Sequence, residues 1–370
     1  MTPAGAPGAA RGTGGAPSRP PQVLVAMSGG VDSSVAAALL VEQGCDVTGV
    51  HLKLAATPAH AQVQGKGCCT LADADDARRV ADALGIAFYV WDFVDEFQEA
   101  VVDDFAAEYA RGRTPNPCAR CNERVKVVGL LARARALGFD ALATGHYARV
   151  AGGRLYRGAD PAKDQSYVLY MLGPEDLTHL RLPLGGLTKP QVRRTAARLG
   201  LRTAAKPESY DVCFIPDGDT AGWLERRLGR RPGQVVDAGG RVLGAHQGAY
   251  RYTVGQRRGL GVAAPSPRYV LRIEPAAGQV VVGDRADLAI RTVELEGATA
   301  TDGLGLRPGP ARVRLRAHGR ETGCLVVPTG PGQVRLDLDE PADAVAPGQA
   351  GVLYDGDLVL GGGTVAATAP

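Results

Sequence analysis

A serine- and glycine-rich turn follows an apolar run near the start of the chain, and its composition is suited to binding an anion. Residues 23–27 are all apolar, which predicts a buried parallel strand, and Ser28-Gly29-Gly30 then turns the chain. Asp32-Ser33-Ser34 are helix N-cap residue types, and residues 35–41 continue as an apolar helix. Glycines let backbone N–H groups approach an oxyanion, and a helix N-terminus favours negative charge. The spacing therefore predicts a phosphate-binding loop.

The identity of this loop follows from what it lacks and what it contains. It has neither the lysine of the common NTPase P-loop nor the G-x-G-x-x-G spacing of dinucleotide-binding folds. Residues 28–33 instead resemble the pyrophosphate loop of the ATP-pyrophosphatase enzymes, which split ATP between its α and β phosphates and attach AMP to a substrate oxygen. The simpler alternative is an ordinary strand–turn–helix corner, but a turn alone does not require this set of residues.

Two cysteines on separate loops are the candidates for nucleophilic chemistry. Cys121 ends a proline-containing loop and is expected at the N-terminus of a helix over residues 122–137, where the thiol pKa is lowered. Cys213 lies on a second loop, between Val212 and Phe214. Beside an ATP site, such a pair indicates sulfur transfer; the alternative is two unrelated buried cysteines, as Cys45 and Cys324 are expected to be.

Alternating strands and helices are expected to position these groups. Strands over residues 46–54, 87–91 and 141–144 follow the first one, with an amphipathic helix over residues 71–84 between them. This order predicts a doubly wound parallel sheet that binds ligands at the carboxyl ends of its strands. A stripe of Phe97, Val101, Phe105 and Tyr109 at helical spacing is expected to pack in the core rather than to stack on bases.

Short β-runs separated by glycine and proline turns dominate after residue 235 and predict a C-terminal antiparallel β-barrel. Its expected strands include residues 280–282, 293–296, 311–316, 324–327, 334–338 and 351–354. The expected organisation is a disordered leader over residues 1–21, an ATP-pyrophosphatase catalytic domain over 22–207, a small central domain that contacts tRNA over 208–283 and the barrel over 284–370.

Composition limits the class of protein. The chain has 370 residues, enough for two or three domains, and its 45% hydrophobic and 22% charged residues are ordinary for a globular protein. A net charge of +3 permits a nucleic-acid partner without requiring one. No apolar run approaches membrane-spanning length, and seven cysteines, an odd number, argue against a secreted disulfide framework. We expect a cytoplasmic protein with no membrane partner.

Eleven short motifs occur along the chain in the order found in one enzyme family. The chain resembles the tRNA-specific 2-thiouridylases, which replace the C2 oxygen of the wobble uridine of tRNA by sulfur, and only the leader lies outside the resemblance. The motifs are Ser28–Ser33, Gly112–Pro117, Cys121–Asn122, Ala143–Tyr147, Lys163–Tyr167, Cys213–Ile215, His246–Gly248, Gly255–Arg257, Gly259–Gly261, Pro347–Gln349 and Gly361–Gly363.

The resemblance implies a mechanism and the residues that perform it. ATP, with Mg2+, adenylates the uridine C2 oxygen so that AMP becomes the leaving group. Cys213 corresponds to the residue that carries sulfur as a persulfide, and Cys121 to the nucleophile that resolves it, ending in a Cys121–Cys213 disulfide. The implied partners are tRNA and a persulfide donor, either a cysteine desulfurase or a relay protein, and no resident metal site is expected.

The resemblance also implies two sets of binding residues. The ATP set comprises Ala26, Met27, Ser28, Gly29, Gly30, Val31, Asp32, Ser33, Leu52 and Gly145, with the last two at the adenosine. The tRNA set comprises Asn116, Pro117, Cys118, His146, Lys163, Asp164, Gln165, Arg316 and Gln349.

One residue departs from the family pattern. Many relatives carry an aspartate, which resembles a general acid or base, where this chain has Cys118. Either another group moves that proton, or Cys118 does, or the step needs no dedicated base. Cys118-x-x-Cys121 with Cys213 forms an alternative set of ligands for a metal or iron–sulfur cluster. The sequence leaves the role of Cys68-Cys69 open.

Two other functions share parts of this pattern. Amidating ATP-pyrophosphatase ligases have the same loop but no need of Cys121 and Cys213. A non-enzymatic ATP- and RNA-binding module would need the barrel without the two cysteines. For the barrel, alternating Arg312, Arg314 and Arg316 predict a basic strand face that contacts RNA; an ordinary solvated face is the alternative.

Overall fold

Five parallel strands form the sheet that carries the loop after residue 27. The computed structural model describes residues 19–55, 71–206 and 212–370. The strands are ordered β3-β2-β1-β4-β7, and every neighbouring pair is parallel. The expected doubly wound sheet is confirmed, with β7 as a short addition. The bounds are β1 Gln22–Ala26, β2 Asp46–Lys53, β3 Ala87–Asp92, β4 Ala141–Ala143 and β7 Leu180–Arg181.

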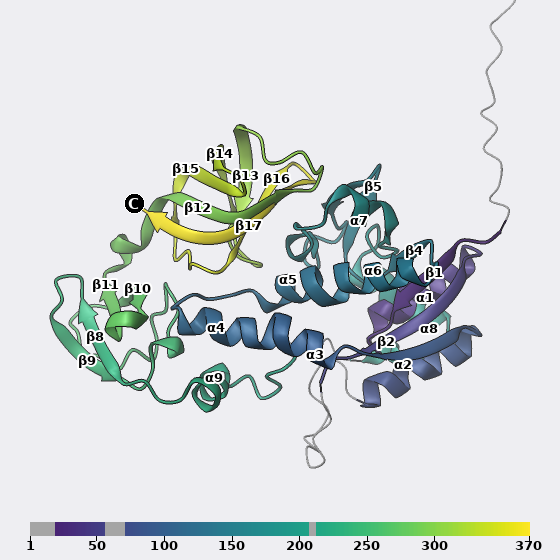
Figure 1. Cartoon of the computed structure of the whole chain (residues 1–370), viewed down its shortest axis with the longest axis horizontal. Coiled ribbons are helices and arrows are strands. Elements are labelled where there is room, and N and C mark those ends of the chain that lie inside the picture. Colours follow the sequence, from purple (N-terminus) through teal and green to yellow (C-terminus); the bar gives the residue numbers. More distant parts are fainter. Residues whose placement is uncertain (1–18, 56–70, 207–211) are drawn as a thin grey trace, which may run out of the picture.

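Helices cover both faces of this sheet (Figure 1). Side chains of β1 alternate between the two layers: Val23 and Val25 pack with α1 (Val31–Glu42), α2 (Leu71–Leu84) and α8 (Lys189–Arg198), whereas Leu24 packs with α6 (Val128–Ala136). All three β1 residues are almost completely buried. Because the helix N-termini and strand ends meet at one edge, the loop residues gather there.

Two interrupted helices extend from the sheet. The first comprises α3 (Val94–Phe97), η1 (Gln98–Asp103) and α4 (Asp104–Ala110), and it runs toward the central domain (Figure 1). The second comprises α5 (Pro117–Cys121), η2 (Asn122–Lys126) and α6. The expected helix start at residue 122 was therefore wrong, because Pro117 is accommodated in the first turn, where its missing N–H is not needed.

The central domain is a four-stranded sheet joined to α4 through a short helix. The strands are ordered β10-β11-β8-β9, with bounds Tyr269–Glu274, Gln279–Gly283, Gly233–Asp237 and Val242–His246. Helix α9 (Thr220–Leu228) places Leu224 against Phe105 and Tyr250. Residues 280–282 lie in β11, parallel to β8, so their assignment to the barrel was wrong. A valine run between glycines does not encode which distant strand it pairs with.

A closed six-stranded antiparallel barrel forms the C-terminal domain, as expected. The order β12-β15-β14-β13-β16-β17 closes through pairing of β12 with β17. Strand β17 contains a glycine run in which side chains would not fit: a Cβ on Gly361 would lie 2.0 Å from the Thr299 carbonyl oxygen. The bounds are β12 Ala289–Ala300, β13 Gly309–Arg314, β14 Glu321–Gly330, β15 Gln333–Asp343, β16 Ala350–Asp355 and β17 Leu358–Ala369.

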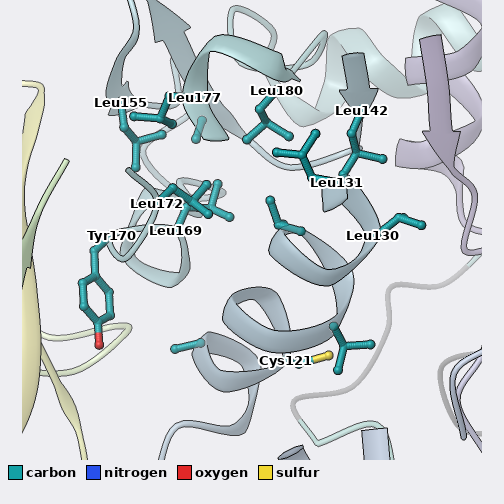
Figure 2. Packing of buried hydrophobic residues seen from close by; sticks show 14 of the residues in the cluster. Cys121, Leu130, Leu131, Leu142, Leu155, Leu169, Tyr170, Leu172, Leu177 and Leu180 are labelled. Atoms are coloured by element: carbon teal, nitrogen blue, oxygen red, sulfur yellow. The ribbon is translucent and has the colours of Figure 1, made fainter. Parts of the chain in front are cut away.

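The barrel and the catalytic domain share one hydrophobic core. The hairpin β5 (Ala148–Ala151) and β6 (Arg154–Arg157) extends the barrel sheet through a bridge from Tyr156 to Leu358. Leu155 and Leu169 pack in the same cluster as barrel residues such as Val352, and Figure 2 shows the catalytic-domain part of this cluster. The shared core fixes the barrel beside α5.

Short helices complete the fold. They are α7 Pro174–His179, η3 Ser166–Val168, η4 Arg202–Ala205, η5 Ala249–Arg251, η6 Pro275–Ala277 and η7 Arg285–Leu288. No helix in the described parts of the chain is both long enough and apolar enough to cross a membrane. The expected leader over residues 1–21 lies largely outside the described residues, but Arg19 forms an ion pair with Asp140.

Candidate functional site

Serine hydroxyls hold the loop between β1 and α1 in a closed turn. The Ser33 hydroxyl accepts a hydrogen bond from the Ser28 N–H at 3.1 Å and donates to the Gly30 carbonyl oxygen at 3.2 Å. Ser34 donates to the same carbonyl at 2.8 Å. Gly30 is the N-cap of α1, so the first turn of the helix begins at the loop. The backbone is thereby fixed around the helix N-terminus.

Two glycines allow other segments to approach this turn closely. Gly29 has φ of +73°, and a Cβ there would lie 2.2 Å from the Asp73 carbonyl oxygen. A Cβ on Gly145, which follows β4, would lie 2.8 Å from the Ser33 backbone nitrogen. Side chains are therefore excluded from a backbone cradle at a helix N-terminus, an arrangement that fits the phosphate chain of ATP.

Asp32, in the first turn of α1, is held by two side chains. Lys189 Nζ lies 2.8 Å from both carboxylate oxygens, and the Tyr147 hydroxyl donates to one of them at 2.7 Å. The sequence analysis identified Asp32 as a site residue and Tyr147 only as the end of a motif, and it did not include Lys189. The sequence signal for Lys189 was a cation at the start of a helix, where the helix dipole is unfavourable for it.

A second lysine secures the loop from the opposite side. Lys206 Nζ donates to the Gly29 carbonyl oxygen at 3.0 Å and to Asp73 and Asp76 of α2 at 2.8 and 2.7 Å. Burial lowers the pKa of Lys206, but its hydrogen bonds to Asp73 and Asp76 outweigh burial and raise it overall. Lys206 was not recognised from sequence. Cys68 and Cys69, which precede α2, lie outside the described residues.

The residues expected around adenosine lie at the same edge of the sheet. Leu52 is buried near the end of β2, and Gly145 contacts the start of α1. His51, beside Leu52, is buried and its Nδ1 lies 2.9 Å from the Met27 carbonyl oxygen, which fixes the end of β1. Contact with adenosine itself stays a prediction.

His146 follows Gly145 and is held in a neutral state. Its Nδ1 lies 2.8 Å from the Thr144 hydroxyl. Burial, with a smaller contribution from the Lys126 charge, lowers the pKa of His146 to about 4. At neutral pH the imidazole is therefore uncharged, so any contact it makes with RNA uses hydrogen bonding or stacking rather than charge.

We expect the stability of the fold to fall as pH falls from about 6.5 to about 4. The unfolded chain binds a proton at His146 below its ordinary pKa, whereas the folded chain does not until about pH 4, so protonation favours unfolding in that window. NMR titration of His146 should give a midpoint near 4. A midpoint at 6.5, or a His146→Gln variant with unchanged pH dependence of unfolding, would contradict this.

The helix that carries the first cysteine motif begins with an amide cap. The side-chain oxygen of Asn116, Oδ1, accepts hydrogen bonds from the N–H groups of Cys118 and Ala119, both at 3.1 Å. Cys118 is exposed in the first turn of α5, and Cys121 is buried at the last residue of α5. The thiol nearest the helix N-terminus is thus Cys118 rather than Cys121, contrary to expectation.

Aromatic packing positions the second cysteine. Phe214 contacts Phe97, Phe105 and Trp223, with ring centroids 5.9, 5.3 and 5.5 Å away. The aromatic stripe of the α3–α4 helix is therefore core, as expected. Cys213, half-buried, packs against the same cluster that contains Cys121 (Figure 2 shows Cys121). The two cysteines that sequence placed on separate loops thus adjoin one apolar cluster.

The described thiols form neither a disulfide with one another nor a metal centre. No disulfide links Cys45, Cys118, Cys121, Cys213 and Cys324 to one another, and these are the cysteines that the structure describes. Across residues 19–55, 71–206 and 212–370, no three His, Cys, Asp or Glu side chains are grouped as metal ligands. Burial raises the pKa of the Cys324 thiol to about 12, as expected for a structural cysteine.

Comparison with known proteins identifies the family. Three family profiles match in succession: a tRNA methyl transferase HUP domain over residues 21–217, a tRNA methyl transferase PRC-barrel domain over 221–284 and an aminomethyltransferase beta-barrel domain over 299–365. The tRNA-specific 2-thiouridylase MnmA of Thermobifida fusca is 54% identical over 94% of this chain and 96% of its own length. The chain belongs to the tRNA-specific 2-thiouridylase family.

Other relatives agree with this assignment. The proteins of the same name from Mycolicibacterium smegmatis and Nocardioides sp. are 53% and 51% identical, over 93% and 94% of this chain and 99% and 98% of their own lengths. As a member of the thiouridylase family, the chain is an enzyme of the tRNA-uridine 2-sulfurtransferase class, and the parallel-sheet domain, central domain and barrel are the three parts of that family.

The thiouridylase loop at residues 163–165 is partly committed to internal contacts. The Asp164 side chain is almost fully buried. It accepts hydrogen bonds from Gly158, Ser166 and Arg314 and lies 3.7 Å from Arg157. The exposed Gln165 accepts from the Tyr147 N–H at 2.9 Å. These contacts favour Asp164 as the residue that shapes the loop, with Lys163 and Gln165 nearer the surface.

Of the barrel residues expected to contact RNA, some make internal contacts and others are exposed. Gln349 donates to the Thr114 carbonyl oxygen at 2.7 Å and thereby ties the barrel to the loop before α5. Arg314 pairs with Glu321 of the barrel at 2.7 Å and donates to Asp164 at 3.3 Å, so it belongs to the interface with the catalytic domain. Arg312 and Arg316 are exposed, but Arg316 lies beyond the end of β13. The expected basic face is therefore reduced to Arg312 and Arg316, and Arg312 also donates to the Glu321 carbonyl oxygen at 3.1 Å.

Proposed function

We propose that this thiouridylase activates the C2 oxygen of the tRNA wobble uridine with ATP and replaces it with sulfur carried by Cys213. The observation that supports this most directly is the pairing of an ATP-pyrophosphatase loop with two cysteines that adjoin one apolar cluster. Asp32 and Gly29 lie at the loop, and Cys121 and Cys213 lie at that cluster. Such a combination is needed for sulfur transfer and not for amidation.

The chemistry proceeds in three balanced steps. The uridine C2 oxygen attacks the α phosphate of ATP, which forms the adenylated base and releases pyrophosphate. The terminal sulfur of the Cys213 persulfide attacks C2, and AMP leaves with the oxygen. Cys121 thiolate then attacks the Cys213 sulfur, which breaks the S–S bond, leaves sulfur on C2 and forms a Cys121–Cys213 disulfide. A dithiol reductant restores both thiols for the next cycle.

The loop over residues 28–33 binds the phosphates of ATP and takes no part in forming or breaking bonds. Backbone N–H groups of residues 28–33 and the N-terminus of α1 hold the phosphates, with Ala26 and Met27 leading into the loop and Val31 starting the helix. Asp32 would hold Mg2+, which supplies charge neutralisation at the pyrophosphate. Its carboxylate, one-third exposed in the first turn of α1, is placed for such a role.

Substrate tRNA is proposed to lie across α5 and the loop at residues 163–165. Asn116, Pro117 and Cys118 form the start of α5, and His146 lies beyond β4. Cys118 is exposed there, so it is available to move a proton in place of the family aspartate. We propose in addition that a persulfide donor protein supplies the sulfur and that the enzyme acts in the cytoplasm.

The deciding experiment measures both products of the proposed reaction. Purified protein, ATP, unmodified tRNA and a persulfide source should give 2-thiouridine and pyrophosphate in equal amounts, measured by nucleoside mass spectrometry and a pyrophosphate assay. Pyrophosphate release with transfer of nitrogen to a small acceptor would favour an amidating ligase. ATP and tRNA binding with no pyrophosphate would favour a non-enzymatic module.

We expect Arg316→Ala to weaken tRNA binding and flatten its salt dependence without changing ATP binding. Each phosphate contact that is lost should reduce the slope of log K against log salt by roughly 0.7 to 0.9. Arg335→Ala is the matched control, because Arg335 is also exposed but lies on β15, away from β13. Equal slopes for Arg316→Ala and wild type would leave Arg316 as ordinary solvated surface.

A further inference from the structure

Four charged side chains meet where the barrel covers the loop at residues 163–165. Asp164 lies on the loop, Arg157 ends β6, and Arg314 and Glu321 lie on the barrel strands β13 and β14. Arg314 Nη1 donates to Asp164 at 3.3 Å and its Nη2 donates to Glu321 at 2.7 Å, so one guanidinium bridges the two carboxylates. Arg157 lies 2.8 Å from Glu321 and 3.7 Å from Asp164 and bridges them a second time. We call these four side chains the interface ion network.

The interface ion network is largely removed from water. The Asp164 side chain is 3% exposed, and none of the other three exceeds 18%. The Arg157 guanidinium carbon lies 3.6 Å from the ring centroid of Tyr354, a barrel residue that is fully buried. Two positive and two negative charges balance within the network, as burial of charged groups requires.

A purely stabilising role does not account for four buried charges. Removing charges from water costs free energy that their mutual attraction often only offsets, so apolar side chains of similar volume would join two domains at least as well. Apolar packing already joins the catalytic domain and the barrel, because Leu155, Leu169 and Val352 lie in one cluster. What charged groups add to such an interface is direction, since each hydrogen bond requires a particular placement of donor and acceptor.

The group that receives this direction is the Asp164 carboxylate. One of its oxygens accepts the N–H groups of Gly158 and Ser166 at 3.0 and 3.1 Å, and the other accepts the Ser166 hydroxyl at 3.0 Å and Arg314. The carboxylate therefore joins the backbone on both sides of the loop to the barrel. The Tyr354 hydroxyl lies 3.4 Å from the Ser166 hydroxyl, so the barrel reaches this segment at a second point.

We propose that Arg157, Arg314 and Glu321 are positioning residues for the proposed thiolation. They hold the Asp164 carboxylate, and through it the loop at residues 163–165, in the shape that receives tRNA. The inference rests on the proposed function, which places tRNA across this loop. In this role the barrel does more than offer a surface to RNA, because two of its side chains fix a tRNA-contacting segment of the catalytic domain.

Steady-state thiolation kinetics with the full-length enzyme test the proposal. Arg314→Met/Glu321→Gln removes both barrel members and leaves Arg157 and Asp164 as a balanced pair, so neither of these two charges is left alone. The KM for tRNA should rise about tenfold, as expected when a loop must be ordered on binding, whereas the KM for ATP should change by less than about twofold. The kcat at saturating tRNA should change by less than about threefold.

Asp357→Asn is the matched control for the link between the two domains. It removes the Arg149–Asp357 ion pair at 2.6 Å, which also joins the catalytic domain to the barrel, but the Asp357 side chain contacts no member of the interface ion network. This variant should keep the wild-type KM for tRNA. If the network only held the domains together, both variants would lower Tm and neither would change the KM for tRNA, and the proposal would be overturned.

A double-mutant cycle shows whether the effect runs through Asp164. Asp164→Asn should raise the KM for tRNA by itself. Adding Arg314→Met to Asp164→Asn should raise it by less than about twofold more, because the carboxylate that Arg314 positions is already absent. A further rise of about tenfold would mean that Arg314 acts on tRNA by another route, and it would overturn the proposal.

The outcomes also distinguish this inference from the proposed function. Wild-type protein that neither binds tRNA nor forms 2-thiouridine would overturn both. Wild-type activity together with an unchanged KM for tRNA in Arg314→Met/Glu321→Gln would overturn the inference alone. If that variant does not fold, Asp164→Asn/Arg314→Met decides by comparison with Asp164→Asn, since it leaves Arg157 and Glu321 as a balanced pair.

Discussion

Cys213→Ser is expected to eliminate both thiolated tRNA and the protein-bound persulfide, whereas Cys121→Ser eliminates only the product. Serine has a similar shape but is not ionised at neutral pH, so it neither carries a persulfide nor attacks one. Isotopically labelled sulfur followed by peptide mass spectrometry should locate the label on Cys213 in wild-type and Cys121→Ser protein. Nucleoside analysis should show no 2-thiouridine with either variant.

The burial of the two thiols gives this division of roles its physical basis. Cys121 is 5% exposed, whereas Cys213 is half-buried and is thus the more accessible thiol for a protein donor. Cys45→Ser is a matched control, because Cys45 is also half-buried but lies between α1 and β2, and it should leave product and label unchanged. Label on Cys121 in the Cys213→Ser protein would reverse the two roles.

Loss of product through misfolding is a separate outcome that must be excluded. A serine hydroxyl at buried Cys121 costs about 1–3 kcal/mol if it finds no hydrogen-bond partner. Cys121→Ala avoids this cost, so both substitutions should give the same chemical result if the missing thiol is responsible.

Iron analysis of protein purified without oxygen tests the alternative of an iron–sulfur cluster. Stoichiometric iron in wild type that is lost in Cys118→Ser would favour a cluster over the thiol mechanism.

Features encoded locally could be predicted from the sequence. The loop over residues 28–34 was predictable because its strand, glycines and helix start are consecutive, although the N-cap is Gly30 and the expected cap residues 32–34 lie inside the first turn of α1. The aromatic stripe through Phe97 and Phe105 was predictable because its period matches a helix. By contrast, the start of α5 was misplaced because proline was taken to exclude a helix that it in fact begins.

Features that depend on distant pairing could not be predicted in this way. Lys189 and Asp32 are 157 residues apart, and only the packing of α8 beside α1 brings them together. Arg314 is a second example of distant pairing. Its alternation with Arg312 predicted an exposed strand face, but Arg314 donates to Asp164, which belongs to another domain. A charged residue at regular spacing does not reveal whether a second domain covers it, and the shared core shows that one does.

Asp32→Asn is expected to abolish thiolation because it removes the loop's only carboxylate while keeping its shape. The amide oxygen still accepts hydrogen bonds from Lys189 and Tyr147, which in the structure bind this side chain at 2.8 and 2.7 Å. Asp32→Ala would remove those contacts as well and leave the nearly buried Lys189 ammonium without its carboxylate, which costs about 1–3 kcal/mol at a partly exposed pair. Asparagine therefore tests chemistry with less disturbance of the fold.

The diagnostic result is the response of binding to magnesium. In wild type, Mg2+ should strengthen binding of ATP and pyrophosphate, because Asp32 holds the cation beside the phosphates. In Asp32→Asn this increase should disappear, whereas binding without divalent cations should stay the same or improve, since a negative charge next to the anion has been removed. Normal pyrophosphate release from tRNA and ATP by Asp32→Asn would exclude Asp32 from the reaction. A preserved magnesium response would assign the cation to another carboxylate, with Asp73 and Asp76 beside Gly29 as the next candidates.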